Sequence, residues 1–278
     1  MIHKEFSLTT IDGLKLFGQS WQAKKQTIAV INLIHGIGEH STRYAEMAAF
    51  YTENGIAIYA IDYRGHGKSE GKRGHTPSYE HIMQDIDLLL DYSKKDNNCK
   101  KQFIYGHSLG GNLVINYVLR RQPDITGLIA SSPWLKLGFE PPKWKVKMAN
   151  IVKNIFPSLS QKTGFHKEDL SKNLKNIELY EKDNLVHNKI TVKLFVDAYD
   201  AAKWALSNAK NMPVPFLLMH GNEDKMTSPE GSREFASKNE KTHLKIWEGF
   251  YHEIHNEKNN IDVYNYVIEW VKSEIKPL

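Results

Sequence analysis

The stretch FIYGHSLGGNLVINYVLRR, residues 103–121, decides the fold. Its first three residues are apolar and suit a short buried strand, and the residues from Leu109 onward have the pattern of a helix. Between them, GHSLG at residues 106–110 matches the motif G-x-S-x-G, in which a sharp strand-to-helix turn lifts the serine hydroxyl above the sheet. The motif predicts Ser108 as a nucleophile. The backbone N–H of Leu109, at the start of the helix, is then placed to stabilise a developing oxyanion.

Short apolar runs alternate with helical patterns on both sides of this motif. Buried strands are expected at residues 28–34, 56–61, 103–105, 128–130, 214–219 and 243–247, and helices at 41–54, 79–93, 109–121, 229–238 and 261–275. Asp12-Gly13 predicts an N-terminal hairpin between residues 5–10 and 14–21. Strands that alternate with helices form parallel sheets. The sequence therefore predicts an α/β fold with a mostly parallel central sheet, an N-terminal antiparallel hairpin and flanking helices.

The alternation stops at Pro133 and resumes near residue 214. The intervening residues have helical or irregular patterns and scattered aromatic side chains, without a buried-strand run. We expect one α/β core formed by residues 1–133 and 208–278, with an inserted helical cap, or lid, at residues 134–207. Two separate domains fit less well, because the later strands need the earlier sheet to pair with.

Composition places the chain among ordinary globular proteins. Of its 278 residues, 41% are hydrophobic and 25% are charged, which excludes disordered, collagen-like and coiled-coil proteins. The 37 Lys and Arg residues against 32 Asp and Glu give a net charge of +5, and no dense basic block indicates nucleic-acid binding. Cys99 is the single cysteine, so no intramolecular disulfide forms. No apolar run is long enough to span a bilayer and no secretory signal is recognised, so we expect a soluble, cytoplasmic protein.

A serine nucleophile needs a base, and the base needs a carboxylate that orients it. In folds with this motif, the chain order is serine, then acid, then histidine. His252 lies in the loop between the last expected strand and the last helix, where its imidazole can reach the serine. The acid is expected after the strand at 214–219, where Glu223 and Asp224 are neighbours, and we favour Asp224. His252 and His255 are one residue closer than the zinc motif H-E-x-x-H requires, so no metal site is expected.

Four segments resemble, in the same order, the monoacylglycerol lipase and lysophospholipase branch of the α/β-hydrolase family. They are HGIGEHSTRY at residues 35–44, DYRGHGKSEGKRGH at 62–75, GNED at 221–224 and EGFYH at 248–252. The resemblance extends over almost the whole chain. It implies an α/β-hydrolase fold and a catalytic triad of Ser108, Asp224 and His252. In the second segment, Asp62 and Arg64 are expected to brace their own loop.

The resemblance also implies how the substrate is held. The backbone N–H of Ile37 is expected to join that of Leu109 as a second oxyanion donor. In the related branch, polar residues around the triad bind the glycerol hydroxyls, and the matching positions here are Glu39, Arg43 and His255. Arg43 follows Glu39 by four residues on an expected helix, a spacing that allows an ion pair.

The implied function is that of a serine carboxylester hydrolase. It would cleave monoacylglycerols or similar single-chain lipids through an acyl-enzyme, without a cofactor. The alternatives are a lysophospholipase, a proline-iminopeptidase-like serine peptidase and a non-catalytic binding protein of the same fold. Apolar residues interleaved with lysines at residues 134–156 suit either a helix packed on the core or an acyl-binding lid that makes transient contact with a membrane surface. The oligomeric state is left open.

Overall fold

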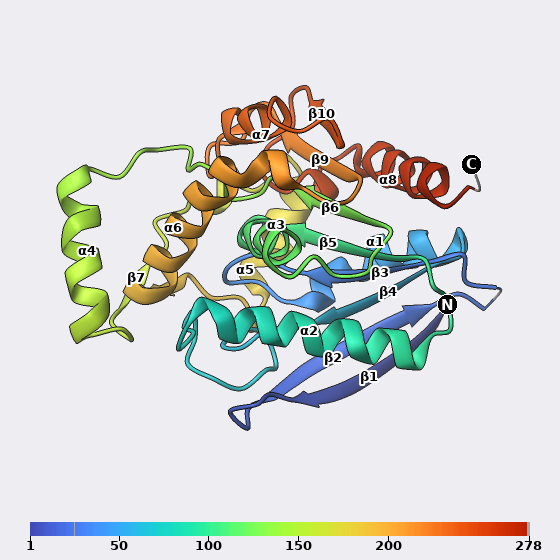
Figure 1. Cartoon of the computed structure of the whole chain (residues 1–278), viewed down its shortest axis with the longest axis horizontal. Coiled ribbons are helices and arrows are strands. Elements are labelled where there is room, and N and C mark those ends of the chain that lie inside the picture. Colours follow the sequence, from blue (N-terminus) through green and yellow to red (C-terminus); the bar gives the residue numbers. More distant parts are fainter. Residues whose placement is uncertain (25, 277–278) are drawn as a thin grey trace.

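The computed structural model describes residues 1–24 and 26–276 and is built around an eight-stranded sheet (Figure 1). The strand order is β1-β2-β4-β3-β5-β6-β9-β10, with β2 antiparallel to β1 and β4 and the other neighbours parallel. The strands are β1 (Ile2–Thr9), β2 (Lys15–Gln22), β3 (Ala29–Ile34), β4 (Ile56–Ile61), β5 (Gln102–His107), β6 (Gly127–Ser131), β9 (Phe216–Gly221) and β10 (Thr242–Trp247). The predicted mostly parallel sheet with an N-terminal antiparallel hairpin is confirmed.

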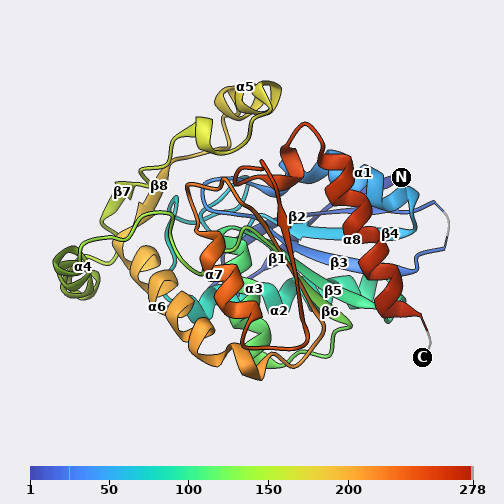
Figure 2. The same cartoon turned by 90° about the horizontal axis from the view of Figure 1, so that it is seen from above.

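Helices cover both faces of this sheet (Figure 2). They are α1 (Ala45–Glu53) and α8 (Asn260–Ile275) on one face, and α2 (Tyr79–Asp96), α3 (Leu109–Arg121), α6 (Val192–Asn208) and α7 (Pro229–Ala236) on the other. Every residue of the central strand β3 is buried. Val30 and Ile34 pack with α2 and α3, whereas Ile31 and Leu33 pack with α1 and α8. Because successive side chains point to opposite faces, a strand covered on both sides needs a continuous apolar run.

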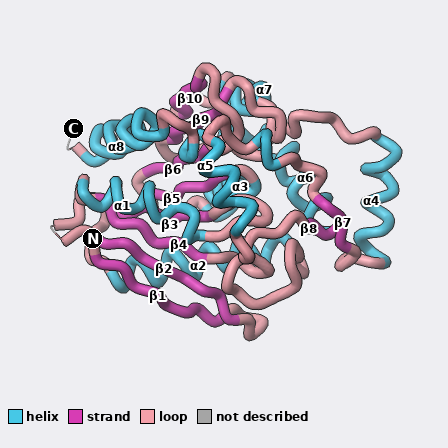
Figure 3. Tube along the Cα trace, turned by 180° about the vertical axis from the view of Figure 1, so that it is seen from behind, coloured by secondary structure: helices cyan, strands magenta, loops and turns pink. Residues whose placement is uncertain are grey.

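Residues 132–215 connect β6 to β9, are all described, and add no strand to the eight-stranded sheet. They form α4 (Lys143–Ile155), α5 (Leu174–Lys182), α6 and a small antiparallel sheet of β7 (Ser160–Lys162) and β8 (Lys189–Thr191). Helix α4 has no buried residue, lies at the edge of the molecule (Figures 1 and 3) and contacts α6. By contrast, α6 packs on α3 and contributes Leu194, Ala198 and Ala202 to the main core. The cap at residues 134–207 stays a prediction. Within these residues, α6 packs against the core as one of its helices.

No helix of the described residues is both long enough and apolar enough to cross a membrane. The cytoplasmic location stays a prediction.

Asp62, directly after β4, holds the loop that follows β3. Its carboxylate accepts hydrogen bonds from the amide and the hydroxyl of Ser41 (2.7 and 2.6 Å) and from the amide of Lys68 (2.9 Å). The Ser41 hydroxyl thus donates to Asp62 and accepts from Gln19, and it caps no helix amide of the described residues. Residues Ser41–Tyr44 form a 3₁₀ turn, and α1 begins at Ala45, later than the predicted start.

Arg64 braces the same region from inside the protein. Its side chain is 1% exposed and donates two hydrogen bonds to the buried carboxylate of Asp85 (2.7 and 2.8 Å). It also pairs with Asp12 in the β1–β2 turn (2.9 Å). The expected bracing of the loop is present for Asp62, which accepts the Lys68 amide, whereas, among the described residues, the Arg64 side chain binds Asp85 and Asp12 outside the loop and not the loop backbone.

Replacing Arg64 is expected to destabilise the fold strongly. The variant Arg64→Met keeps much of the side-chain volume but leaves Asp85 buried without its cation, which costs about 3–5 kcal/mol of unfolding free energy. Denaturant unfolding measures this loss. The matched control is Lys68→Met, because Lys68 pairs with Glu5 and both side chains are about half exposed; its loss is expected to be about 1 kcal/mol or less. Equal losses in the two variants would contradict the role given to Arg64.

Candidate active site

Ser108 occupies the turn between β5 and α3, with a backbone φ of 53° and ψ of −117°. A positive φ is strained for a residue other than glycine, and such strain is common at functional sites. The two glycines of the motif make the turn possible. A Cβ on Gly106 would overlap the carbonyl of Gly110, and a Cβ on Gly110 would overlap the carbonyl of Ile34. The strand–turn–helix arrangement predicted from the motif is therefore present.

Asp224 and His252 meet at the carboxyl ends of two neighbouring parallel strands. Asp224 follows β9 and His252 follows β10, and the His252 Nδ1 atom lies 2.7 Å from Asp224 Oδ2. The other carboxylate oxygen of Asp224 accepts the amides of Met226 and Thr227 (2.8 and 3.0 Å). The Glu223 carboxylate is instead 47% exposed and pairs with a surface lysine. Of the two neighbouring carboxylates, Asp224 is the one that contacts the imidazole.

Burial and their mutual contact shift the pKa values of both Asp224 and His252. Burial alone would raise the pKa of Asp224, but the charge of His252 and hydrogen bonds from His220 and His252 outweigh it and hold that pKa well below its usual range. Burial lowers the pKa of His252, but the charge and hydrogen bond of Asp224 more than offset it, so the pKa lies above its ordinary value of 6.5. An ionised Asp224 therefore stabilises the protonated form of His252.

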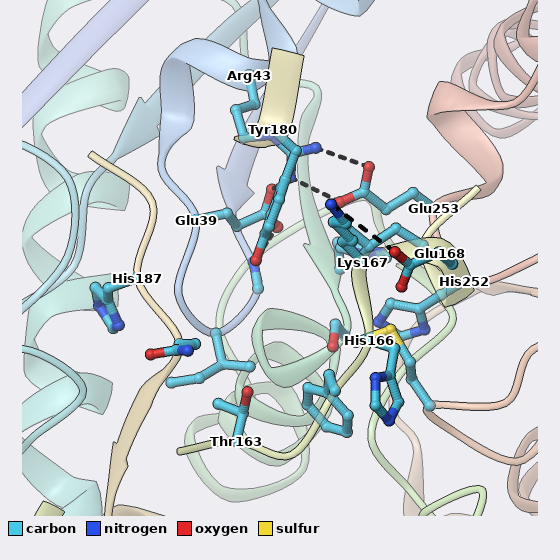
Figure 4. A pocket seen from close by; sticks show the side chains of 18 residues that line it. Glu39, Arg43, Thr163, His166, Lys167, Glu168, Tyr180, His187, His252 and Glu253 are labelled. Carbon is cyan, nitrogen blue, oxygen red and sulfur yellow. Dashed lines mark hydrogen bonds and ion pairs between the residues drawn. The ribbon is translucent and has the colours of Figure 1, made fainter. Parts of the chain in front are cut away.

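A cavity of about 390 Å³ has Ser108, His252 and Ile37 in its lining, and Figure 4 shows His252 among the side chains around it. Within the described residues, the amides of Ile37 and Leu109 donate to no protein acceptor. Unused amides beside a nucleophile can bind an anionic oxygen. Among the described residues, no hydrogen bond joins the Ser108 hydroxyl to the His252 imidazole, although both groups line the cavity. Such catalytic hydrogen bonds often form fully only when substrate binds.

Glu39 and Arg43 line the same cavity and form the ion pair that their spacing predicts, with 2.8 Å between Arg43 Nη1 and Glu39 Oε2. Arg43 also makes a two-pronged pair with Glu253 (2.7 and 2.8 Å). No sequence motif indicates a role for Glu253. Its position directly after His252 was the one available signal.

His255 does not line this cavity. Its ring is 1% exposed and stacks on Tyr44, with 4.8 Å between ring centroids, while it packs edge-on against His107 at 4.7 Å. The structure thus brings Glu39 and Arg43 to the cavity but leaves His255 behind its wall, and a role of His255 in binding substrate stays a prediction.

The inserted segment supplies much of the cavity lining, but not from the stretch that the sequence singled out. The lining residues come from positions 163–188 and include Phe165, Leu170 and Tyr180, whereas no residue of α4 takes part. No periodic pattern marks positions 163–188, so their place at the cavity follows only from the fold. Among the described residues, no group of three or more His, Cys, Asp or Glu side chains is arranged to hold a metal ion.

The model of a known protein family, described as serine aminopeptidase S33, matches residues 25–259. The chain belongs to this family of α/β-hydrolases. A human monoglyceride lipase is 30% identical to this hydrolase over 95% of the chain and 89% of the relative. The crystal structure of a Paleococcus ferrophilus monoacylglycerol lipase has a TM-score of 0.86 and 34% identity, and covers 93% of this chain and 99% of that one.

An uncharacterized abhydrolase domain-containing protein of Dictyostelium discoideum is 36% identical to this hydrolase over 97% of the chain. The chain spans 29% of the length of that relative. Since the human and Paleococcus proteins match along nearly their whole length, a single α/β-hydrolase unit of this size is a shared feature.

The pKa of the His252 imidazole is expected to fall in the variant Asp224→Asn. Without the carboxylate charge, burial favours the neutral ring more strongly, so the pKa falls from its raised position. An NMR titration of the histidine side chains measures the shift. Glu223→Gln is the matched control, because it removes the adjacent, exposed carboxylate and should leave His252 unchanged. A His252 pKa that stays the same in Asp224→Asn would refute this electrostatic coupling.

Proposed function

We propose that this protein hydrolyses carboxylic esters, with monoacylglycerols as its substrate class and Ser108 as its nucleophile. One observation carries the proposal: a strained serine, an imidazole paired with a buried carboxylate and the residue that carries the unused Ile37 amide line one cavity, and the unused Leu109 amide directly follows the serine. The human and Paleococcus relatives support the substrate class, because they are named as lipases of this kind and match over nearly their whole length.

The reaction follows from the positions of these groups. The Ser108 hydroxyl oxygen attacks the ester carbonyl carbon while His252 takes the hydroxyl proton. The amides of Ile37 and Leu109 hold the oxyanion, and Asp224 stabilises the imidazolium. His252 then gives the proton to the departing alcohol, which leaves an acyl group on Ser108. Water, activated by His252, attacks the acyl carbon and releases the fatty acid and the free serine.

The alternative functions are distinguished by simple assays. A fluorophosphonate probe labels an activated serine, so the absence of labelling would favour a non-catalytic binding protein. Hydrolysis of a prolyl anilide in preference to an ester would favour a peptidase of the S33 type.

Because His252 must be neutral to accept a proton, kcat/KM for ester hydrolysis is expected to fall as the pH drops through the raised pKa of His252.

Loss of any member of the triad should nearly abolish ester hydrolysis. Ser108→Ala, Asp224→Asn and His252→Ala are each expected to lower kcat on the order of 10⁴-fold, and the losses should not add, because the three groups act as a unit. Turnover of a monoacylglycerol measures the effect. Ser132→Ala is the control, since Ser132 is also a buried serine with positive φ, directly after the neighbouring strand, and its hydroxyl has no partner among the residues that the structure describes. A folded Ser108→Ala that keeps a tenth of wild-type turnover would disprove the assignment.

We further propose that α4 contacts the lipid surface from which the substrate comes. Its apolar side chains Trp144, Met148, Ile151 and Ile155 recur at helical spacing and are 54–63% exposed. None of them lines the cavity, so this helix is better suited to a lipid surface than to binding the acyl chain. The lysines at positions 143, 145 and 147 favour anionic lipids, whereas Lys153 pairs with Asp197 and Asp200 of α6.

Polar substitutions on α4 are expected to separate two kinds of activity. The variant Trp144→Ser/Ile151→Ser should bind anionic vesicles several-fold more weakly, because it loses apolar area that inserts into the interface. Hydrolysis of vesicle-borne monoacylglycerol should fall with it, while a dissolved short-chain ester is cleaved as before. Co-sedimentation and parallel assays measure both. Ile11→Ser is the control, because Ile11 is 82% exposed in the β1–β2 turn. Equal vesicle binding by the wild type and the α4 variant would exclude this contact.

A further inference from the structure

Glu39, Arg43 and Glu253 make one part of the cavity lining charged, which suits the polar alcohol of an ester better than its acyl chain, and the cation there is already occupied. The Arg43 side chain is 7% exposed and lines the cavity. Its two terminal nitrogens bind both carboxylate oxygens of Glu253, and one of them also binds Glu39. When one carboxylate accepts hydrogen bonds from both terminal nitrogens of a guanidinium, the same pair of N–H donors is not available to a second anion.

Glu253 is itself firmly held in the ionised state. Besides Arg43, the amide groups of Asn176 and Asn256 donate to its Oε2 atom, each at 2.8 Å. Burial alone would raise the pKa of Glu253, but the charge and hydrogen bonds of Arg43 outweigh it and hold that pKa well below its usual range. Burial raises the pKa of Glu39 above its usual value, against the opposing charge of Arg43. Whichever state Glu39 adopts, the cluster of Glu39, Arg43 and Glu253 therefore carries no net positive charge.

Besides Arg43, the described residues of the cavity lining include one more basic side chain of the lysine or arginine type, that of Lys167, and it is also paired. Lys167 contacts the carboxylates of Glu168 and Glu181. Figure 4 shows Glu39, Arg43, Tyr180 and Glu253 gathered at one end of the cavity, away from Thr163. Within the described residues, this cavity thus presents no arginine or lysine whose charge is free for an acidic ligand.

We propose that Glu253 determines substrate specificity by occupying the guanidinium of Arg43. The cavity then accepts esters of uncharged alcohols and rejects esters whose alcohol carries a phosphate, because an anion there meets carboxylates and no free cation. The inference rests on the proposed ester hydrolysis and adds to it which alcohols are cleaved. Arg43 without Glu253 would be a phosphate-binding group, since its planar fork matches phosphate geometry.

The first test uses the wild-type protein and two substrates. A monoacylglycerol and the matching acylglycerol 3-phosphate share one acyl chain, short enough for both to stay dissolved as monomers. We expect kcat/KM for the uncharged ester to be higher by roughly tenfold or more, as like-charge contact at a polar site disfavours the anion. Equal rates overturn the inference and leave the proposed hydrolysis intact. Failure to cleave either ester counts against the proposed function itself.

The second test releases Arg43. In Glu253→Gln, the ratio of the two kcat/KM values should shift toward the phosphate ester by roughly tenfold, because the guanidinium becomes available to the anion. The double variant Arg43→Gln/Glu253→Gln should lose this gain, which assigns it to Arg43. Only the ratio is compared, because Glu253 adjoins His252 and any effect on the base acts on both esters.

The matched control is Glu168→Gln. Glu168 lines the same cavity and its substitution removes the same charge, but it does not contact Arg43. Its partner Lys167 keeps the contact with Glu181, so this variant releases no cation. Its ratio is expected to stay near that of the wild type. A shift in Glu168→Gln as large as in Glu253→Gln, or a double variant that keeps the gain, would overturn the role of Glu253. Thermal unfolding shows which variants are folded, and the wild-type comparison remains decisive even where a variant is not.

Discussion

The close approach of α3 to β3 is the constraint on which the site depends. A side chain on Gly110 would overlap the carbonyl groups of Ile34 and His35, so only glycine lets the helix lie this near the strand. The contact sets the Leu109 amide beside the loop that carries the Ile37 amide, and it takes the chain through the strained turn at Ser108. A backbone contact, rather than a side-chain interaction, therefore brings the nucleophile and the two amides together.

Buried carboxylates position the other groups of the site, and each of them accepts hydrogen bonds from several donors. Asp62 holds the loop after β3, Asp224 orients the imidazole and Glu253 binds Arg43. Because these groups are paired before substrate arrives, little reorganisation is needed when charge develops. Glu253 also links parts of the molecule, since it follows His252 in the chain and accepts from Asn176 of the inserted segment. The histidine loop, the alcohol end of the cavity and α5 therefore form one connected unit.

Patterns along the chain predicted the elements and the central turn because both are local. The buried strands are apolar runs, and the turn at Ser108 needs glycines two residues to either side, so a short window of sequence is enough to identify each. The preference for Asp224 over Glu223 agrees with the contact to His252, but adjacent carboxylates cannot be told apart by pattern. Their difference arises from which one points inward between β9 and β10.

By itself, then, the sequence determined the order of strands and helices outside residues 134–207, the mostly parallel sheet and the strained turn that carries Ser108. Only the tertiary structure decided that Glu253 binds Arg43, 210 residues away in the chain, that His255 lies behind the cavity wall and that α4 stands outside it. The physical reason is that local periodicity depends on neighbouring residues, whereas these contacts depend on how separate elements pack, which no short stretch of sequence encodes.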